Sequence, residues 1–188
     1  MRGLFAIALL SACAPSTSAM AQSSWPLVPR DFAVPEGLVT PDFQLRKMTI
    51  DEVVRDYDAV MASKAQLQQI YGGSWPEGMT IGEDLADLGW HQGEWARRNS
   101  FAYIVLSPDG TKSLGCVYVY PTQKQGYDAQ VNLWARESLI GDPADQALET
   151  AVKQWMASAW PFRNVGYPGR TIAQEEWAAL PDVARPVR

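Results

Sequence analysis

The chain has 188 residues and a formal net charge of −5, because 21 Asp and Glu outnumber 16 Lys and Arg. An acidic chain without a basic run disfavours nucleic acid and anionic membrane surfaces as partners. Hydrophobic residues make up 47% of the sequence, which excludes an intrinsically disordered protein.

The first 21 residues have the layout of an export signal. Arg2 precedes an apolar run from Leu4 to Leu10, which is too short to span a bilayer as a helix. We therefore predict a signal segment over residues 1–21 and an exported protein. If translation starts at Met20 instead, the chain loses this segment and is cytoplasmic.

Two ends of this signal fit the residues. Leu-Ser-Ala-Cys at positions 10–13 has the pattern of a lipobox, so Cys13 would carry lipid and anchor a lipoprotein to the membrane. Ala-Met-Ala at positions 19–21 fits ordinary signal peptidase, and cleavage after Ala21 would give a free periplasmic chain. Both outcomes stay open, and any membrane contact is expected through the lipid anchor alone.

The mature chain offers few groups for thiol or metal chemistry. Cys116 is the single cysteine outside the signal, and His91 is the one histidine. These residues cannot form a usual zinc ligand set, so we expect no metal. Cys116 lies among strand residues and is expected to be a small core hydrophobe.

Residues 22–42 contain four prolines and are expected to form an extended tether rather than a folded element. From Phe43 the sequence has the pattern of a folded domain. Alternation of apolar and polar residues predicts a first strand over Phe43–Arg46. We expect the folded domain to span residues 43–170. Residues 171–188 are then a C-terminal tail with one helical turn.

Two capping-box patterns predict helix starts. Thr49 with Glu52 opens a helix, and a second helical stretch follows it to Ile70. Thr80 with Glu83 opens a later helix that extends to about Arg98. The predicted buried stripe of the first helix consists of Ile50, Val53, Val54, Tyr57, Val60 and Met61, and that of the later helix of Leu85, Leu88, Gln92 and Trp95.

Three strands and a long helix come next. Residues 101–106 and 113–120 flank the turn Ser107-Pro108-Asp109-Gly110, which predicts a hairpin. Residues 128–136 alternate between a core face and a solvent face, with Gln130, Asn132, Trp134 and Arg136 on the solvent side. Asp142 and Pro143 begin a helix that ends near Ala159, and residues 163–167 form a short last strand.

This order of elements resembles the GNAT superfamily of N-acetyltransferases. SFAYIVLSPDGTKSLGCVYVYP at 100–121 is similar to that family's second and third strands, AQVNLWAR at 129–136 to its fourth strand, and WPFRNVGYPGR at 160–170 to its fifth. The resemblance covers residues 43–170. It implies an α/β fold with a mixed central sheet and flanking helices, shortened at the C-terminus.

The resemblance also implies a site for acetyl-coenzyme A between the fourth and fifth strands. Backbone groups there would pair with the pantetheine arm, and the following loop would hold the pyrophosphate. The implied cofactor residues are Leu133, Trp134, Ala135, Arg136, Leu139 and Gly141. Tyr118, Tyr120 and Trp134 are the substrate-binding candidates. His91 and Tyr167 are the candidates for the base and the proton donor that the family's reaction needs. A packed or half-exposed helix residue is the other interpretation of His91, because it lies between Leu88 and Trp95 at helical spacing.

The chain departs from the family pattern at the pyrophosphate loop. The family has a Q/R-x-x-G-x-G/A loop, whereas this chain reads RESLIGDPAD from Arg136 and has only Gly141 in that stretch. Glu137, Asp142 and Asp145 surround the place of the pyrophosphate and would repel an anion. We expect weak or absent coenzyme binding from these acids. A well-capped structural helix is the alternative interpretation of this segment.

Three functions stay open at this stage. One is an acyl-coenzyme-A-dependent N-acyltransferase acting on a small-molecule or peptide amine. Another is a non-catalytic module of the bacterial envelope that binds a small molecule or peptide in the same cleft. The third is a scaffold lipoprotein that docks a partner through a Trp-rich surface.

Overall fold

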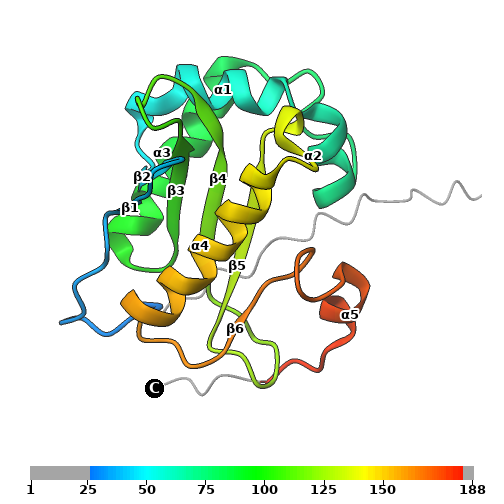
Figure 1. Ribbon diagram of the computed structural model, residues 1–188. Helices are drawn as coiled ribbons and strands as arrows, with labels where there is room; N and C mark the ends of the chain where they lie inside the picture. The colour runs from blue at the N-terminus through cyan, green and yellow to red at the C-terminus, as the bar shows by residue number, and fades with distance from the viewer. Residues whose placement is uncertain (1–25, 184–188) are drawn as a thin grey trace, which may run out of the picture.

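The computed structural model describes residues 26–183, whose strands form a six-stranded sheet (Figure 1). The strands are β1 (Gly37–Val39), β2 (Gln44–Lys47), β3 (Phe101–Leu106), β4 (Ser113–Tyr120), β5 (Ala129–Ala135) and β6 (Val165–Gly166), and they lie side by side in this order. Neighbouring strands are antiparallel except for β5 and β6, which are parallel. The predicted signal segment and Cys13 lie outside the described residues.

Helices cover both faces of this sheet, as Figure 1 shows for α4 on one face. The helical elements are η1 (Ile50–Glu52), α1 (Val53–Met61), α2 (Lys64–Tyr71), α3 (Ile81–Arg97), η2 (Glu137–Leu139), α4 (Pro143–Ala159) and α5 (Gln174–Ala179). Within residues 26–183, no helix combines the length and the apolar character that crossing a membrane requires.

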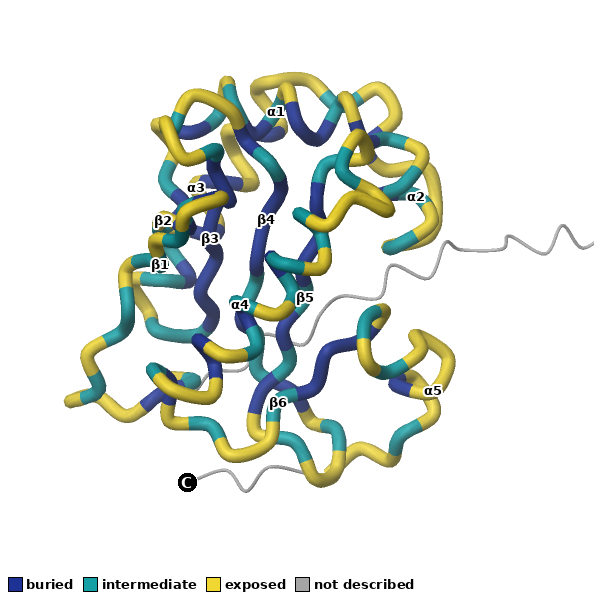
Figure 2. Tube along the Cα trace, viewed as in Figure 1, coloured by how far each residue is buried: buried dark blue, intermediate teal, exposed yellow. Residues whose placement is uncertain are grey.

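The sheet separates two apolar cores, and its central strands are buried along their length (Figure 2). On one face α4 contributes Leu148, Val152, Trp155 and Met156, which pack on β3, β4 and β5. On the other face α1, α2 and α3 contribute Val60, Leu67 and Leu88. Since two faces are covered, β3 is buried at every residue and β5 nearly so.

Several sequence predictions are confirmed locally. The side chain of Thr80 accepts a hydrogen bond from the Glu83 N–H, and the Glu83 carboxylate accepts one from the Thr80 N–H, so α3 begins with a capping box. Asp142 caps α4 through the Ala144 N–H. The β3–β4 hairpin closes through the Gly110 N–H to the Ser107 carbonyl, with Gly110 at φ 71°.

The predicted start of the first helix is wrong. Thr49 makes no side-chain capping bond, and a 3-10 turn precedes α1. The Glu52 carboxylate is instead buried between Arg46 at 3.5 Å and Arg55 at 2.8 Å. An ion pair with a neighbouring strand therefore takes the group that the capping box would use.

The predicted apolar stripes are also partly wrong. Val54 and Leu85 are exposed, while Val60 and Leu88 are buried as expected. The polar residues Asp56 and Asp84 turn inward instead and are only 3% and 2% exposed. α1 and α3 thus bury carboxyl groups against each other, which periodicity alone does not indicate.

The described part of the expected tether, from residue 26 to 42, is folded onto the domain. Gly37–Val39 adds to the sheet as β1, and Val28 is 2% exposed. The Leu27 N–H donates to the Arg98 carbonyl at 2.6 Å, and the Tyr103 hydroxyl donates to the Pro35 carbonyl at 2.6 Å. Tertiary hydrogen bonds therefore override the extended preference of the prolines.

Candidate functional site

Two tyrosines of β4 form the floor of the site. The rings of Tyr118 and Tyr120 stack with centroids 5.7 Å apart and planes 4° from parallel. Their register partners on β5 are Asn132 and Gln130, and the Gln130 amide donates to the Asn132 side chain at 3.4 Å. All four residues are half-buried. A polar and aromatic surface therefore lies on the sheet face that α1 and α3 cover.

α3 brings His91 onto this floor. Its ring lies over Tyr118 with centroids 5.1 Å apart, and Trp90 contacts it edge-on at 4.8 Å. His91 Nε2 is 3.6 Å from the carboxylate of Asp87, one turn earlier on the helix. The structure thus brings together the predicted catalytic His91 and the predicted substrate residues Tyr118 and Tyr120.

Burial controls the protonation of this cluster. It lowers the pKa of His91, although the charges of Asp87 and Glu94 act in the opposite direction, so the imidazole is neutral near pH 7. Burial also raises the pKa of Tyr118 and Tyr120 well above the ordinary range. The imidazole can therefore accept a proton, and the phenols stay protonated and can donate hydrogen bonds.

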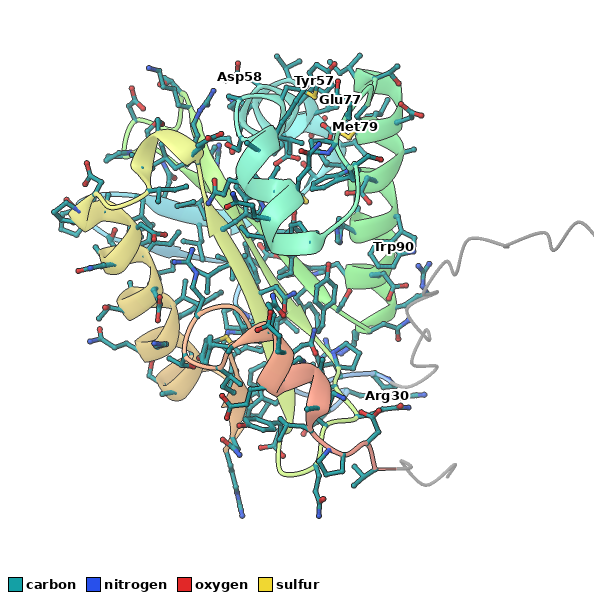
Figure 3. The ribbon with its side chains drawn as sticks, turned by 90° about the vertical axis from the view of Figure 1, so that its right-hand side faces the viewer. Arg30, Tyr57, Asp58, Glu77, Met79 and Trp90 are labelled. Atoms are coloured by element: carbon teal, nitrogen blue, oxygen red, sulfur yellow. The ribbon has the colours of Figure 1, made fainter. Side chains whose placement is uncertain are left out.

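A cavity of about 350 Å³ opens beside the cluster, and Asp87 belongs to both. The lining residues are Trp75, Glu77, Gly78, Met79, Glu83 and Asp87. Figure 3 shows Glu77 and Met79 near Tyr57, whose hydroxyl donates to the Met79 carbonyl at 3.0 Å. The Trp75 ring is held edge-on by Tyr71, with centroids 5.7 Å apart. The cavity therefore combines an aromatic wall with three carboxyl groups.

Two predicted site residues lie elsewhere. Trp134 is fully buried in the core with Leu88 and Cys116, so it neither faces solvent nor lines a pocket. Tyr167 is 8% exposed and packs in the α4-side core, with Lys153 Nζ over its ring at 5.6 Å. The pairing of Tyr167 with His91 as two catalytic groups is therefore not supported, because they belong to opposite faces of the sheet.

The predicted cofactor residues on β5 are engaged with the protein. Leu133 and Ala135 are buried, and the Leu133 carbonyl faces the guanidinium of Arg170 at 3.5 Å. Arg136 forms an ion pair with Asp58 at 2.8 Å and thereby joins the end of β5 to α1. Arg136 thus has a structural role in this fold.

The loop after β5 does not fit a diphosphate. The Glu137 N–H donates to the Ser63 hydroxyl, the Leu139 N–H to the Arg136 carbonyl and the Asp142 N–H to the Leu139 carbonyl. Pro143, the first residue of α4, has no N–H. The N–H of Ala144 donates to the side chain of Asp142, which caps the helix. Gly141 is exposed at φ 76° and closes a turn. Several backbone donors of this loop are therefore already bonded within the protein.

Sequence reasoning missed three residues of this region. Asp87 lies one turn before His91, so helical spacing could have identified it. Trp75 and Arg170 lie in segments without periodicity, and only the folded chain shows what they contact. Among residues 26–183, no group of three or more His, Cys, Asp and Glu side chains is placed to hold a metal ion.

No family model matches the sequence, and no curated protein matches it. Solved structures do resemble this chain. The ribosomal-protein-S5-alanine acetyltransferase from Vibrio fischeri has a TM-score of 0.55 at 14% identity, over 65% of this chain and 68% of the other. A ribosomal L7/L12 alpha-N-protein acetyltransferase gives 0.50 at 21% identity, over 70% of each chain.

A microcin C7 self immunity acetyltransferase, solved with acetyl-CoA and AMP, gives a TM-score of 0.51 at 12% identity, over 68% of this chain and 71% of the other. At these identities the likeness concerns the fold. The predicted mixed α/β fold with flanking helices is confirmed, and the described residues share their fold with these acetyltransferases.

Proposed function

We propose that this domain binds an amine in its cationic form, as a small molecule or as part of a peptide, in the cavity beside the His91–Tyr118 cluster. The observation that carries this proposal is the composition of the cavity wall, which Trp75 lines together with Glu77, Glu83 and Asp87. Aromatic faces and carboxylates are the two groups that recognise organic cations.

The charges around the cavity favour a cation over an anion. Hydrogen bonds from the Thr80 N–H and hydroxyl lower the pKa of Glu83, so its carboxylate is ionised. The partner of Asp87 is His91, which burial keeps neutral. Lys64 approaches Glu77 at 3.6 Å and offsets one of the three acids. A net negative wall therefore remains, in agreement with the acidic chain as a whole.

Isothermal calorimetry with spermidine as the probe tests this proposal. We expect saturable binding that weakens with added salt, because exposed carboxylates act through screened charge. Asp87→Asn and Trp75→Ala should each weaken it at least tenfold, while Asp42→Asn, a matched change on the exposed β1–β2 turn, should leave it unchanged. Equal affinities in all four proteins would show that the cavity is not the site.

Acyl transfer to the same amine is the second candidate function. The fold supports it, because structures with this architecture are N-acetyltransferases and one was solved with acetyl-CoA. The neutral imidazole of His91 is suited to remove a proton from an ammonium group. We rank this function second, because several backbone N–H groups of the loop after β5 already donate to other groups of the protein. Mass spectrometry of spermidine incubated with the protein and acetyl-CoA would detect an acetylated product.

We propose in addition that the protein is exported and anchored through Cys13. Arg2, the short apolar run and the lipobox pattern support this placement. The envelope is poor in coenzyme A compared with the cytoplasm, so export favours amine binding over acyl transfer.

A further inference from the structure

The outer edge of β5 is mostly unpaired with another strand. β6 pairs with β5 only at Ala129 with Val165 and at Gln130 with Gly166. Among residues 26–183, no strand follows β6 along that edge toward Ala135. An unpaired edge is where an extended chain with amide groups adds to a sheet.

Arg170 lies on this edge. Its Nη2 is 3.5 Å from the Leu133 carbonyl, and its two terminal nitrogens reach both oxygens of Asp145 at 2.9 and 3.0 Å. Nη1 is also 3.6 Å from Glu149. The Arg170 side chain is 16% exposed, which is low for arginine. One guanidinium therefore cross-links the free edge of β5 to the first turns of α4.

The segment of residues 166–172 fixes the position of Arg170. Gly169 adopts φ 75° and donates its N–H to the Ile172 carbonyl, while the Arg170 and Thr171 N–H groups both point to the Tyr167 carbonyl. Upstream, Gly166 packs directly under the Trp177 ring of α5, where a Cβ atom would collide with the indole. A tight turn and a buried indole thus place the guanidinium on the edge.

The charged groups around Arg170 are paired with one another. Arg170 and Lys153 balance Asp145 and Glu149, with Lys153 paired to Glu149. An anionic ligand that displaced Arg170 would leave the Asp145 carboxylate without its cation and would lie beside it, while Glu149 would keep only Lys153. This charge arrangement opposes the anionic diphosphate of a coenzyme.

We infer that Arg170 closes the edge of β5 with an internal ion-pair bridge, so that the groove used for coenzyme in this fold is not a ligand site in this chain. This closure is independent of the amine cavity, which lies beside α3. The β5 edge pairs with β6 at only two residues, and the Arg170 side chain reaches this edge at the Leu133 carbonyl.

Removing the bridge should reopen the groove. The variant Arg170→Ala, Asp145→Asn, Glu149→Gln removes the guanidinium and both carboxylates together. By calorimetry at low salt, it should bind acetyl-CoA at least tenfold more tightly than the wild type. The matched control Arg30→Ala, Asp42→Asn, Glu36→Gln changes the net charge equally at exposed positions and should bind like the wild type. Equal affinity of the bridge variant and the control would overturn the closure.

A second measurement uses the wild-type protein and needs no variant. Amide hydrogen exchange is followed over residues 129–135 and 165–172 with and without 1 mM acetyl-CoA. A closed groove predicts no added protection in either segment. Protection of both segments by acetyl-CoA would overturn the closure, whatever the variant does. Spermidine binding reports separately on the amine cavity, so failure of one proposal is distinguishable from failure of the other.

Discussion

The thiol of Cys116 in β4 donates a hydrogen bond to Asp56 Oδ1 in α1, at 3.1 Å, inside the core between the sheet and the helices. Burial raises the pKa of Asp56 to about 6, while this hydrogen bond acts in the opposite direction. Burial together with the charge of Asp56 raises the pKa of Asp84 to about 7. Both acids in this apolar region therefore lose their protons at a higher pH than an ordinary aspartate does.

This arrangement predicts that stability falls as pH rises. The folded pKa of Asp56 exceeds the ordinary 3.8, so the folded chain retains a proton that the unfolded chain releases between about pH 4 and 6. Asp56→Asn should reduce the loss in unfolding free energy between pH 4 and pH 8 by on the order of 2 kcal/mol, measured by urea titration. Asp51→Asn, an exposed neighbour, should leave the loss unchanged. A pH-independent wild type would contradict this prediction.

Trp155 anchors α4 on the sheet. It is 7% exposed, and its ring meets Tyr103 and Trp160 edge-on with centroids 5.0 and 5.7 Å apart. Replacing Trp155 with Ala should lower the free energy of unfolding by about 3–5 kcal/mol, because a large cavity remains. Gln154→Ala, at the exposed neighbouring position, should change it by less than about 0.5 kcal/mol. A loss below about 1 kcal/mol for Trp155→Ala would show that α4 packs differently.

Gly115 allows β4 and β5 to approach closely. It adopts φ 143°, and an added Cβ atom would collide with the Trp134 carbonyl. Gly115→Ala should therefore cost at least about 3 kcal/mol of stability. Gly126→Ala is the matched control, since Gly126 has φ 86° with open space around it and should cost only about 1–2 kcal/mol of backbone strain. Similar melting temperatures for the two variants would exclude the steric explanation.

The lipid anchor is tested at Cys13. Cys13→Ala should move the protein from the membrane fraction to the soluble envelope fraction, because the lipobox loses the thiol that carries the lipid. Mass spectrometry of the wild-type N-terminus gives an independent result. An unmodified N-terminus at Gln22 would exclude anchoring but keep export, and an intact chain in the cytoplasm would exclude both.

Much of the fold could be predicted from local patterns. The capping box at Thr80, the Asp142–Pro143 helix start and the Ser107–Gly110 turn each act within a few residues, so the sequence alone determined α3, α4 and the β3–β4 hairpin. Thr49 shows the limit of this reasoning, because its expected partner Glu52 is engaged by Arg46 of the neighbouring strand.

The site depended on contacts between distant segments. Composition singled out His91 as the one histidine, and alternation placed Tyr118 on a strand, but their ring contact arises only when α3 packs on the sheet. The alternation in β5 places Trp134 on the same face as Gln130 and Asn132. Trp134 is nevertheless fully buried, because helices cover that face too. Arg170 reaches the Leu133 carbonyl only when the segment that follows β6 packs beside β5. Local spacing therefore determined the elements, whereas burial and long-range ion pairing decided which side chains meet.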